Sequence, residues 1–523
     1  MTSNGVNLDA LIPREDFAAD STPARGTQSS TIDLGQLKED SFFAQCLRKP
    51  DFQRETVHWA PQKIVDLVSA FLDGDLIPAI ILWRSGQYVF VIDGAHRLSA
   101  ILSWLYDDYG DRARSRAFFS NQIPDEQIKL AEQTRGLISQ QVGTYASFKD
   151  AAKNVSYADG VLAERLGGLA SNSFVAQWVP ALNADGAEKS FFKINQSPTP
   201  VDPAEKRILK SRESAVAIAT RVINRGGVGH KYWEKFQLSA QKEIENLGRD
   251  IYEALYLPPM GSAPIKTSDV PVGGRGYNAL PFIFDLVSLA NDMSQNEKHT
   301  ADVSGDDTIR YLKSVWKNIK RVTTTDPGSL GLHPLVYFYT RGGTFQPIAF
   351  LAVMQFVRTL IDRKKLREFT GIRKEYEAFI TKYKEAFTLI VKSQGAGARS
   401  LPALIGFLNL VFDGLVETKT EADLLAEISS DNRFRFLSTP APVRGAKLDH
   451  GARKFSSSVK SATFVAELME NGVRCAICGA LLHRNSMSTD HIARKAEGGS
   501  ASSQNAQLTH PFCNSTYKEG GKA

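Results

Sequence analysis

The sequence predicts an α+β protein with a mixed N-terminal domain, a mainly helical middle and a small C-terminal domain built around Cys and His residues. Three observations carry this prediction. β-rich runs at residues 77–83 and 88–92 lie between amphipathic helical segments. Helical periodicity dominates from about residue 110 to residue 437. After residue 470, two Cys/His pairs of equal internal spacing bracket a short polar segment.

The size and composition of the chain favour several domains without membrane spans. At 523 residues with 42% hydrophobic residues, the chain exceeds the roughly 100–200 residues of one domain. No segment approaches the ~20 uninterrupted apolar residues of a membrane helix, and the N-terminus lacks the basic-then-apolar order of a secretory signal. Three of the four cysteines lie after residue 470. This clustering predicts a metal site in a reducing cytoplasm rather than a disulfide framework.

Shifts in composition predict the domain boundaries. Residues 1–40 are polar and without periodicity, which is typical of a flexible lead-in. The N-terminal domain is expected over residues 41–210 and the helical domain over residues 211–437. Residues 438–461 are rich in Pro, Gly, Ser and Lys with few apolar side chains, which predicts a linker. The small C-terminal domain then spans residues 462–523.

The distribution of charge favours a polyanionic partner at the C-terminal end. The whole chain carries a net charge of +6, but from Ala441 onward 11 Lys and Arg residues stand against 6 Asp and Glu residues. A locally basic segment attracts nucleic acid; the alternative is a tail whose charge only keeps the chain in solution. Two further basic clusters, at 313–321 and 363–367, are typical of solvated helix faces, with nucleic-acid contact as the alternative.

Four residues in two pairs predict a zinc site. Two residues separate Cys475 from Cys478, and His510 and Cys513 repeat this spacing. Two such pairs supply four soft N and S ligands, which suits tetrahedral Zn²⁺. Because a module of ~60 residues buries little core of its own, the metal would stabilise its fold directly. A redox Cys-x-x-Cys motif or a chance pairing is the alternative.

Between the two pairs lie residues suited to phosphodiester hydrolysis. Cleavage needs an activated water and a cation close to the negative charge that develops on the phosphate. His491 can accept the proton of the water, and Asp490 and Asn514 can bind one hard cation, Mg²⁺ or Mn²⁺. Asn505 can hold the loop that aims the histidine.

This arrangement resembles the HNH (ββα-metal) endonuclease family. Asp490-His491 corresponds to the acidic-His pair on the first strand of the family motif, Asn505 to the central Asn, and Asn514 to the closing His-or-Asn position. The resemblance implies a metal-dependent nuclease, and its motifs interleave with the Cys/His pairs in the order that the family shows.

One departure from the family concerns the zinc ligands. Many zinc-bearing members use four cysteines, whereas His510 takes the third position here, so His483 is a rival ligand. A zinc ribbon that only grips DNA is the alternative to a nuclease; it would explain the Cys/His pairs but not Asp490-His491 together with both asparagines.

The segment after the second β-rich run predicts a phosphate site. The residues Asp93-Gly94-Ala95-His96-Arg97 join a strand to the N-terminus of a helix, where backbone N–H groups and the helix dipole attract anions. Gly94 allows close backbone approach, and Arg97 can pair with phosphate oxygens. Asp93 can orient a cation, a ribose or Arg97 itself. Asp-Gly is also typical of a hairpin turn, which is the alternative for the motif alone.

Together with Gln53-Arg54 upstream, this motif resembles the ParB/sulfiredoxin-like domain in the DGQQR form of GmrS-type restriction subunits. The resemblance covers roughly residues 40–210 and implies nucleoside triphosphate binding or hydrolysis, with the phosphates surrounded by Gln53, Arg54, Asp93, His96 and Arg97. The motif here reads DGAHR, as in ParB and sulfiredoxin relatives, so binding is implied more firmly than hydrolysis.

The combination of the two motifs resembles GmrSD-like modification-dependent restriction enzymes. It implies a DNA endonuclease that is controlled by a nucleotide-binding domain and directed against modified phage DNA. DNA and a nucleoside triphosphate are the expected partners, and no membrane partner is expected. The rival interpretation is a ParB-like NTPase or DNA-binding protein whose zinc tail only grips DNA. Metal-dependent strand cleavage distinguishes the two.

Overall fold

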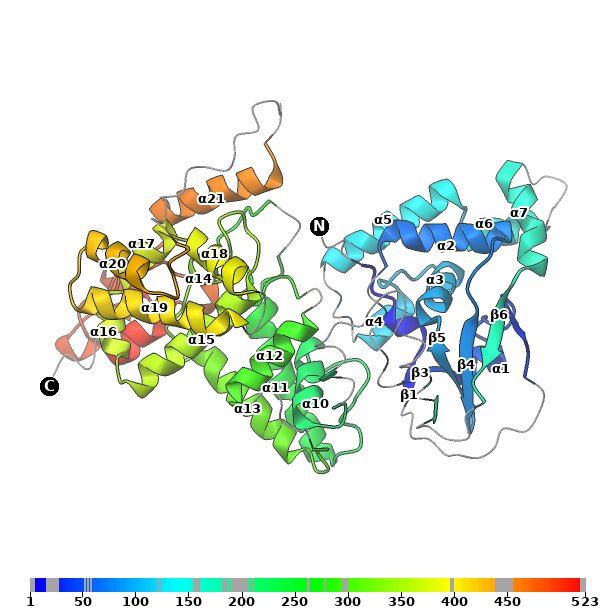
Figure 1. The fold of residues 1–523 in the computed structure, drawn as a ribbon, viewed down its shortest axis with the longest axis horizontal. Helices are drawn as coiled ribbons and strands as arrows, with labels where there is room; N and C mark the ends of the chain where they lie inside the picture. Colours follow the sequence, from blue (N-terminus) through cyan, green and yellow to red (C-terminus); the bar gives the residue numbers. More distant parts are fainter. Residues whose placement is uncertain are drawn as a thin grey trace. The chain divides into compact units, whose positions relative to one another are not determined.

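The computed structural model of the chain consists of two compact units (Figure 1). The N-terminal unit comprises residues 1–218, 228–237 and 299–303, and the C-terminal unit comprises residues 219–227, 238–298 and 304–523. The structure describes residues 5–15, 28–50, 53, 56, 59–119, 121, 123, 125–153, 160–180, 186–187, 190, 207–208, 211–260, 264–276, 279–293, 300–395, 399–437 and 455–517.

The N-terminal unit is built on a six-stranded mixed sheet. The strand order is β1-β3-β5-β4-β6-β2, with the bounds Arg14–Glu15 (β1), Leu47–Pro50 (β3), Tyr88–Asp93 (β5), Ile80–Ser85 (β4), Ser173–Trp178 (β6) and Thr31–Asp33 (β2). β5 pairs in parallel with β3 and antiparallel with β4. β4 also pairs in parallel with β6. The two predicted β-rich runs are therefore the central strands of the sheet.

Helices pack against this sheet around one apolar core. α2 (Pro61–Asp73) has a proline in its first turn and ends at Gly74, whose φ of 76° is left-handed. Its buried side chains include Ile64 and Val68, which share a core with α3 (Ala95–Tyr106) and the central strands. The other helices of the unit are α1 (Phe42–Cys46), α4 (Ala113–Phe118), α5 (Asp125–Gln141), α6 (Tyr145–Lys153) and α7 (Gly160–Ser171).

The first 40 residues differ from the expected flexible lead-in. Val6, Leu8 and Leu11 are buried, β1 pairs with β3, and β2 pairs with β6. The described residues 5–15 and 28–40 are thus part of the folded N-terminal unit. Their order comes from pairing with strands that are distant in the sequence, and such pairing leaves no local periodicity to read.

The C-terminal unit is mainly helical, as predicted for the middle of the chain. α13 (Asp306–Val322) illustrates the local reasons: it is acidic in its first turn, basic in its last, and buries Leu312 and Val315 on one face. Among the described residues, no helix is long and apolar enough to cross a membrane. Further helices of the chain are α10 (Ala215–Asn224), α11 (Leu238–Tyr256), α12 (Leu280–Ala290), α14 (Pro334–Tyr337), α15 (Pro347–Asp362), α16 (Leu366–Gly371), α17 (Arg373–Lys382), α18 (Glu385–Gln394), α19 (Leu401–Val416) and α20 (Glu421–Ser430).

Residues 455–517 form the end of the C-terminal unit and are called the C-terminal module below. The module contains α21 (Ser457–Asn471), the antiparallel hairpin of β7 (Ser488–His491) and β8 (Ala506–Thr509), and a short helical segment, η7 (Cys513–Tyr517). α21 begins within the segment 438–461 that was expected to be a linker. Residues 438–454 of that segment lie outside the described residues.

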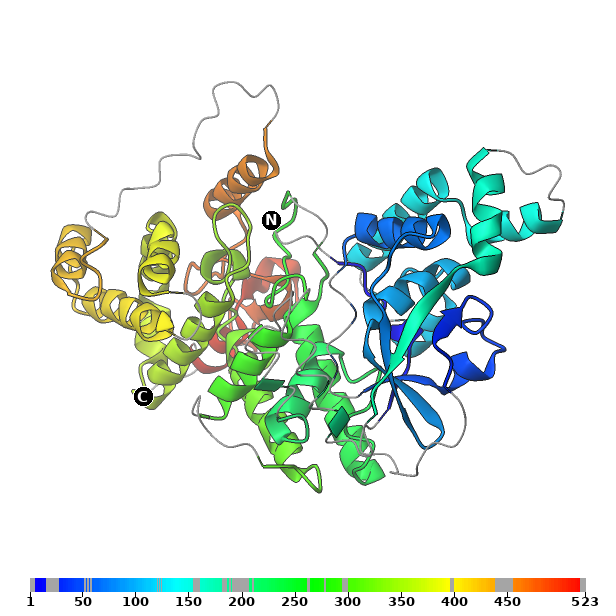
Figure 2. The same cartoon turned by 45° about the vertical axis from the view of Figure 1, so that its right-hand side comes forward.

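The C-terminal module packs against the helices of its own unit, and the views in Figures 1 and 2 agree on this placement. Phe512 N donates to Ser329 O at 3.0 Å, and Thr324 N donates to Ser486 Oγ at 2.8 Å. Hydrogen bonds with the helical part of the unit, and not the preceding segment alone, therefore hold the module in place.

Candidate functional site

Cys475, Cys478, His510 and Cys513 come together in the C-terminal module. All four are buried, and their ligand atoms lie within 4.8 Å of one another. His510 Nδ1 lies 3.3 Å from Cys478 Sγ and 3.9 Å from Cys513 Sγ, whereas its Nε2 lies 3.1 Å from Leu481 O. An Nε2–H group that donates to this carbonyl leaves Nδ1 as the nitrogen that faces a metal, which is the usual orientation of a histidine ligand.

The electrostatics of this Cys₃His cluster fit a bound cation. Hydrogen bonds from Cys478 and Cys513 lower the pKa of Cys475, and the two donor thiols have raised pKa values because they donate to it. Burial lowers the pKa of His510, so its imidazole is neutral. Three thiols this close cannot all ionise without a positive ion among them. Thiolates and a neutral imidazole are the forms that bind a transition metal.

His483, the rival ligand, lies outside this cluster. Its side chain is buried, its Nε2 lies 3.0 Å from Val270 O, and its Nδ1 accepts a hydrogen bond from Asn485 N at 3.4 Å. Both ring nitrogens are thus engaged by backbone groups. The geometry favours His510 as the fourth member of the metal-binding set.

Asp490 lies on β7, and Asn514 of η7 contacts the face of β7 that carries Asp490. Asp490 lies directly opposite Gln507, whose Nε2 donates to Asp490 Oδ2 at 2.8 Å. Asn514 Nδ2 donates to Ser488 Oγ at 2.8 Å. Because alternate residues of a strand share a face, Ser488 and Asp490 lie on the same face of β7. One carboxylate oxygen of Asp490 and the Oδ1 atom of Asn514 can therefore serve as hard ligands from the same side.

His491 is the last residue of β7 and pairs with Ala506. Its side chain is partly buried. Since neighbouring residues of a strand point to opposite faces, Asp490 and His491 leave β7 in different directions. A phosphate that contacts both side chains must approach the end of the strand, where the backbone no longer separates the two faces.

Asn505 holds the loop that follows His491. Its Oδ1 accepts from Ala493 N at 2.7 Å, and its Nδ2 donates to Ala493 O at 3.0 Å and to Ser500 O at 2.8 Å. The loop closes tightly enough that a Cβ at Gly499 would lie 1.9 Å from Ala493 O. The side-chain amide of Asn505 therefore bonds both ends of this loop and fixes its conformation.

In the N-terminal unit, Gln53 lies next to the end of β5. Its side chain is 8% exposed, its Nε2 lies 3.5 Å from Ile92 O, and its Oε1 has no hydrogen-bond partner within the described part of the chain. Asp93 follows Ile92, and Gly94 precedes α3 with a φ of 98° and without a side-chain cap. A Cβ at Gly94 would lie 2.6 Å from Ile80 Cδ1, so this position requires glycine.

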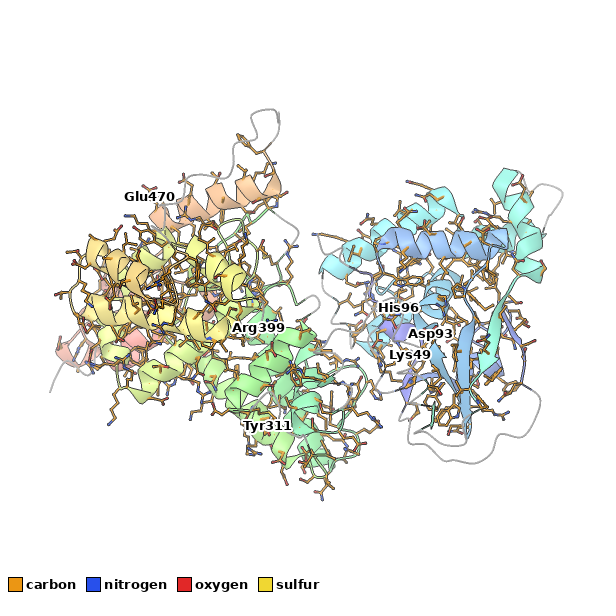
Figure 3. All side chains as sticks on the ribbon, in the orientation of Figure 1. Lys49, Asp93, His96, Tyr311, Arg399 and Glu470 are labelled. Carbon is orange, nitrogen blue, oxygen red and sulfur yellow. The ribbon has the colours of Figure 1, made fainter. Side chains whose placement is uncertain are left out.

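His96 and Arg97 lie in the first turn of α3. The ring of His96 stacks on Trp59 with 5.7 Å between the ring centroids. Arg97 Nη2 donates to Asp93 Oδ2 at 2.8 Å and to Ala79 O at 3.0 Å. Figure 3 shows Asp93 and His96 in the same part of the unit. Of the three functions considered for Asp93, these contacts support the orientation of Arg97.

Sequence reasoning missed the residues that hold the Gln53 segment. Asp9 Oδ1 accepts from Lys49 Nζ at 2.7 Å, from Arg14 Nη2 at 2.7 Å and from Thr56 N at 3.2 Å. Arg14 in turn donates to Gln53 O. All five residues of this network are buried. Its members are scattered through a polar stretch and share no spacing rule, so no local signal could have identified them.

Ion pairs occupy much of the two basic clusters in the helical region. The pairs and their N–O distances are Lys313–Glu243 at 2.7 Å, Lys320–Asp326 at 3.6 Å, Arg363–Asp413 at 2.6 Å and Lys365–Glu368 at 2.6 Å. These contacts support the interpretation of both clusters as solvated helix faces.

A hairpin with an Asp-His pair, an adjoining helical segment with an asparagine and a neighbouring Cys₃His cluster together fit a metal-binding nuclease domain. Comparison with known protein families agrees: residues 475–520 match the HNH endonuclease family, and residues 34–212 match the N-terminal domain of the GmrSD restriction endonuclease. No curated protein and no solved structure matches the chain. The chain thus combines a GmrSD-type restriction domain with an HNH endonuclease domain, the architecture of a metal-dependent restriction endonuclease. The predicted resemblance is confirmed.

Proposed function

We propose that this chain is a DNA endonuclease that restricts phage DNA under the control of a bound nucleotide, with modified DNA as the substrate. The observation that carries the proposal is that Asn514 contacts the face of β7 on which Asp490 lies, and that β7 ends at His491. The HNH match supports the cutting reaction, and the GmrSD-type domain supports its control by a separate part of the chain.

In the cleavage step, His491 acts as the general base that accepts a proton from the attacking water. Asp490 and Asn514 would hold Mg²⁺ or Mn²⁺, and the bound cation would supply positive charge beside the phosphate. Gln507 donates to one carboxylate oxygen of Asp490 and so orients the side chain. Asn505 keeps the loop after His491 in place.

Zinc is the proposed ion of the Cys₃His cluster, because three thiols and one imidazole nitrogen within 4.8 Å suit a tetrahedral, borderline-soft ion. His510 directly follows β8, and Cys513 directly precedes Asn514. A metal held by these two residues would therefore set the position of Asn514 relative to the hairpin. The function of this ion is structural.

The N-terminal unit is proposed to bind a nucleoside triphosphate at the start of α3. Two observations support this site: the first turn of α3 has no side-chain cap, and the buried Oε1 of Gln53, which lacks a partner among the described residues, can accept from a hydroxyl or amino group of the nucleotide. Uncapped N–H groups at a helix N-terminus attract phosphate. The residues proposed to contact the nucleotide are Gln53, Asp93, Gly94, His96, Arg97 and Arg54, of which Arg54 lies outside the described residues.

A plasmid assay tests the whole proposal. The purified chain is incubated with supercoiled plasmid, modified or unmodified, with and without Mg²⁺ or Mn²⁺ and with each nucleoside triphosphate in turn. Strand cleavage that requires the metal and changes with one nucleotide supports the proposal. Retention of intact DNA would point to a DNA-binding protein, and nucleotide hydrolysis with intact DNA would point to a ParB-like NTPase.

A further inference from the structure

Arg373 lies buried against the Cys₃His cluster, although it belongs to the helical part of the C-terminal unit. The residue begins α17 and is 1% exposed. Its Nη1 lies 3.4 Å from His510 Nδ1, and its guanidinium donates to Leu330 O and Gly331 O. A guanidinium removed from water needs compensating negative charge and acceptors. The groups that contact the guanidinium therefore indicate which negative charge it compensates.

A buried carboxylate and a tyrosine hydroxyl lie beside the guanidinium. Arg373 Nε donates to Glu377 Oε1 at 2.8 Å, and Tyr337 Oη donates to the same oxygen at 3.0 Å. The guanidinium thus has a carboxylate partner within its own helix and reaches the Cys₃His cluster through His510.

The metal-loaded cluster carries a charge that this arrangement can offset. Three thiolates, a neutral imidazole and a divalent ion sum to one net negative charge. All four ligand residues are buried, so water cannot solvate this charge. Arg373 supplies a permanent positive charge beside His510, because a guanidinium stays protonated at any physiological pH.

The same guanidinium also contacts the loop between α13 and α14, and His510 packs against this loop. Gly331 in this loop has a φ of 59°, and a Cβ there would lie 2.6 Å from His510 Cδ2. Next to it, Ser329 O accepts from Phe512 N at 3.0 Å. Arg373 therefore touches both sides of the contact between the C-terminal module and the helices.

We propose that Arg373 is an outer-sphere partner of the zinc centre that offsets the excess charge of the Cys₃His ligands and couples metal binding to docking of the C-terminal module. The inference rests on the proposed zinc site. It concerns a residue outside both family matches. Loss of an outer-sphere partner commonly weakens metal binding by about 10–100-fold. The same range is expected here.

The test measures the zinc affinity of the full chain by competition with a chromophoric chelator, with circular dichroism to check folding. Arg373→Met is expected to weaken zinc binding about 10–100-fold and to speed alkylation of the cysteines. Arg373→Lys keeps the charge and is expected to retain most of the affinity. Tyr337→Phe is the matched control, because it removes a hydrogen bond from the same buried network without changing its charge.

Two results would overturn the proposal. The first is a zinc affinity of Arg373→Met equal to that of the unmodified chain. The second is an equal loss in Arg373→Met and Tyr337→Phe, because the effect would then follow packing rather than charge. Arg373→Gln, a neutral variant that keeps N–H donors, decides the point if Arg373→Met does not fold. An unmodified chain that binds no zinc would instead refute the zinc site itself, so the two failures are distinguishable.

Discussion

Gln507 donates a hydrogen bond to Asp490 across the hairpin of the HNH domain, with 2.8 Å between Nε2 and Oδ2. The two residues are direct partners in the register of β7 and β8, and Asp490 is 7% exposed. A buried carboxylate with one oxygen bonded in this way has its orientation set before any cation binds. The Asp-His motif identifies the carboxylate, whereas the cross-strand amide orients it.

Replacing Gln507 is therefore expected to change the metal requirement of cleavage. Gln507→Ala removes a hydrogen bond to a charged group, which contributes about 1.5–3 kcal/mol. The Mg²⁺ concentration for half-maximal cleavage should rise about tenfold or more, as measured by a metal titration of plasmid nicking. Gln504→Ala, at an exposed position on the loop before β8, is the control. An unchanged Mg²⁺ requirement in Gln507→Ala would show that the amide does not position Asp490.

His491→Ala should lower the cleavage rate by about 10²–10⁴-fold, because the attacking water loses its general base. DNA binding and metal binding should persist, since the variant removes no ligand. Single-turnover cleavage and a DNA retention assay measure the two effects separately. Thr489→Ala, an exposed position on the same strand, serves as the control. Nicking at the normal rate by His491→Ala would remove this residue from the mechanism.

Asn505→Ala should affect the rate without affecting the metal requirement. The substitution breaks the hydrogen bonds that join Ala493 to Ser500, so the loop after His491 loses its single arrangement. A displaced catalytic group of this kind lowers the rate by about 100-fold. Two quantities are measured: the cleavage rate and the hydrogen exchange of the Ala493 amide. The rate is expected to fall and the exchange to become faster. A slower rate with unchanged exchange would contradict the assigned function of Asn505.

The buried His483 predicts a loss of stability at acid pH. Burial lowers its pKa from the ordinary 6.5 to about 4. Between these values the unfolded chain binds a proton that the folded chain does not, so the stabilisation is complete above pH 6.5 and is lost as the pH falls toward 4. Between pH 8 and pH 5 the free energy of unfolding should fall by about 2 kcal/mol through this residue.

Comparison with His483→Gln isolates this contribution, because Gln can still donate to Val270 O and does not titrate. The measurement is urea unfolding of both proteins at pH 8 and pH 5. His333 packs edge-on against His483 with 5.5 Å between the ring centroids, and its pKa is lowered by burial and by the charge of His483. The same comparison in a His333→Gln background therefore removes its contribution. Equal pH dependence in the two proteins would mean that His483 has the same pKa in the folded and unfolded chain, which contradicts the prediction.

Gln53→Ala should weaken nucleotide binding about tenfold or more, because the variant loses a buried amide that hydrogen-bonds the nucleotide and leaves the partner group unsatisfied. Calorimetric titration with each nucleoside triphosphate measures the change. Gln62→Ala, on an exposed face of α2, controls for the general effect of losing a glutamine. Equal affinities in Gln53→Ala and the unmodified chain would place the nucleotide elsewhere or remove it from the mechanism.

Much of the fold could be predicted because its signals are local. The apolar spacing of α2 and α3 and the β-rich runs of β4 and β5 are each set by neighbouring residues. The two Cys/His pairs belong to the same category, since a fixed spacing in each pair already suits a shared metal ion. The four residues of this set do converge in the structure.

Other features could not be predicted because they depend on residues that are far apart in the chain. β1 and β2 gain order only from their partners β3 and β6. Asp9 becomes a buried acceptor only when Lys49 and Thr56 surround it. No residue spacing encodes such contacts, since non-local pairing is set by the packing of the whole unit.

Short-range patterns, then, were sufficient to predict an α+β chain with a nuclease motif at one end and a GmrSD-type motif at the other, because helices, strands and metal pairs arise within a few residues. Folding in three dimensions brings His510 rather than His483 to the three cysteines, pairs Gln507 with Asp490 and buries Arg373 beside His510. Each of these depends on which distant surfaces come into contact, and that is governed by burial and charge compensation across the unit.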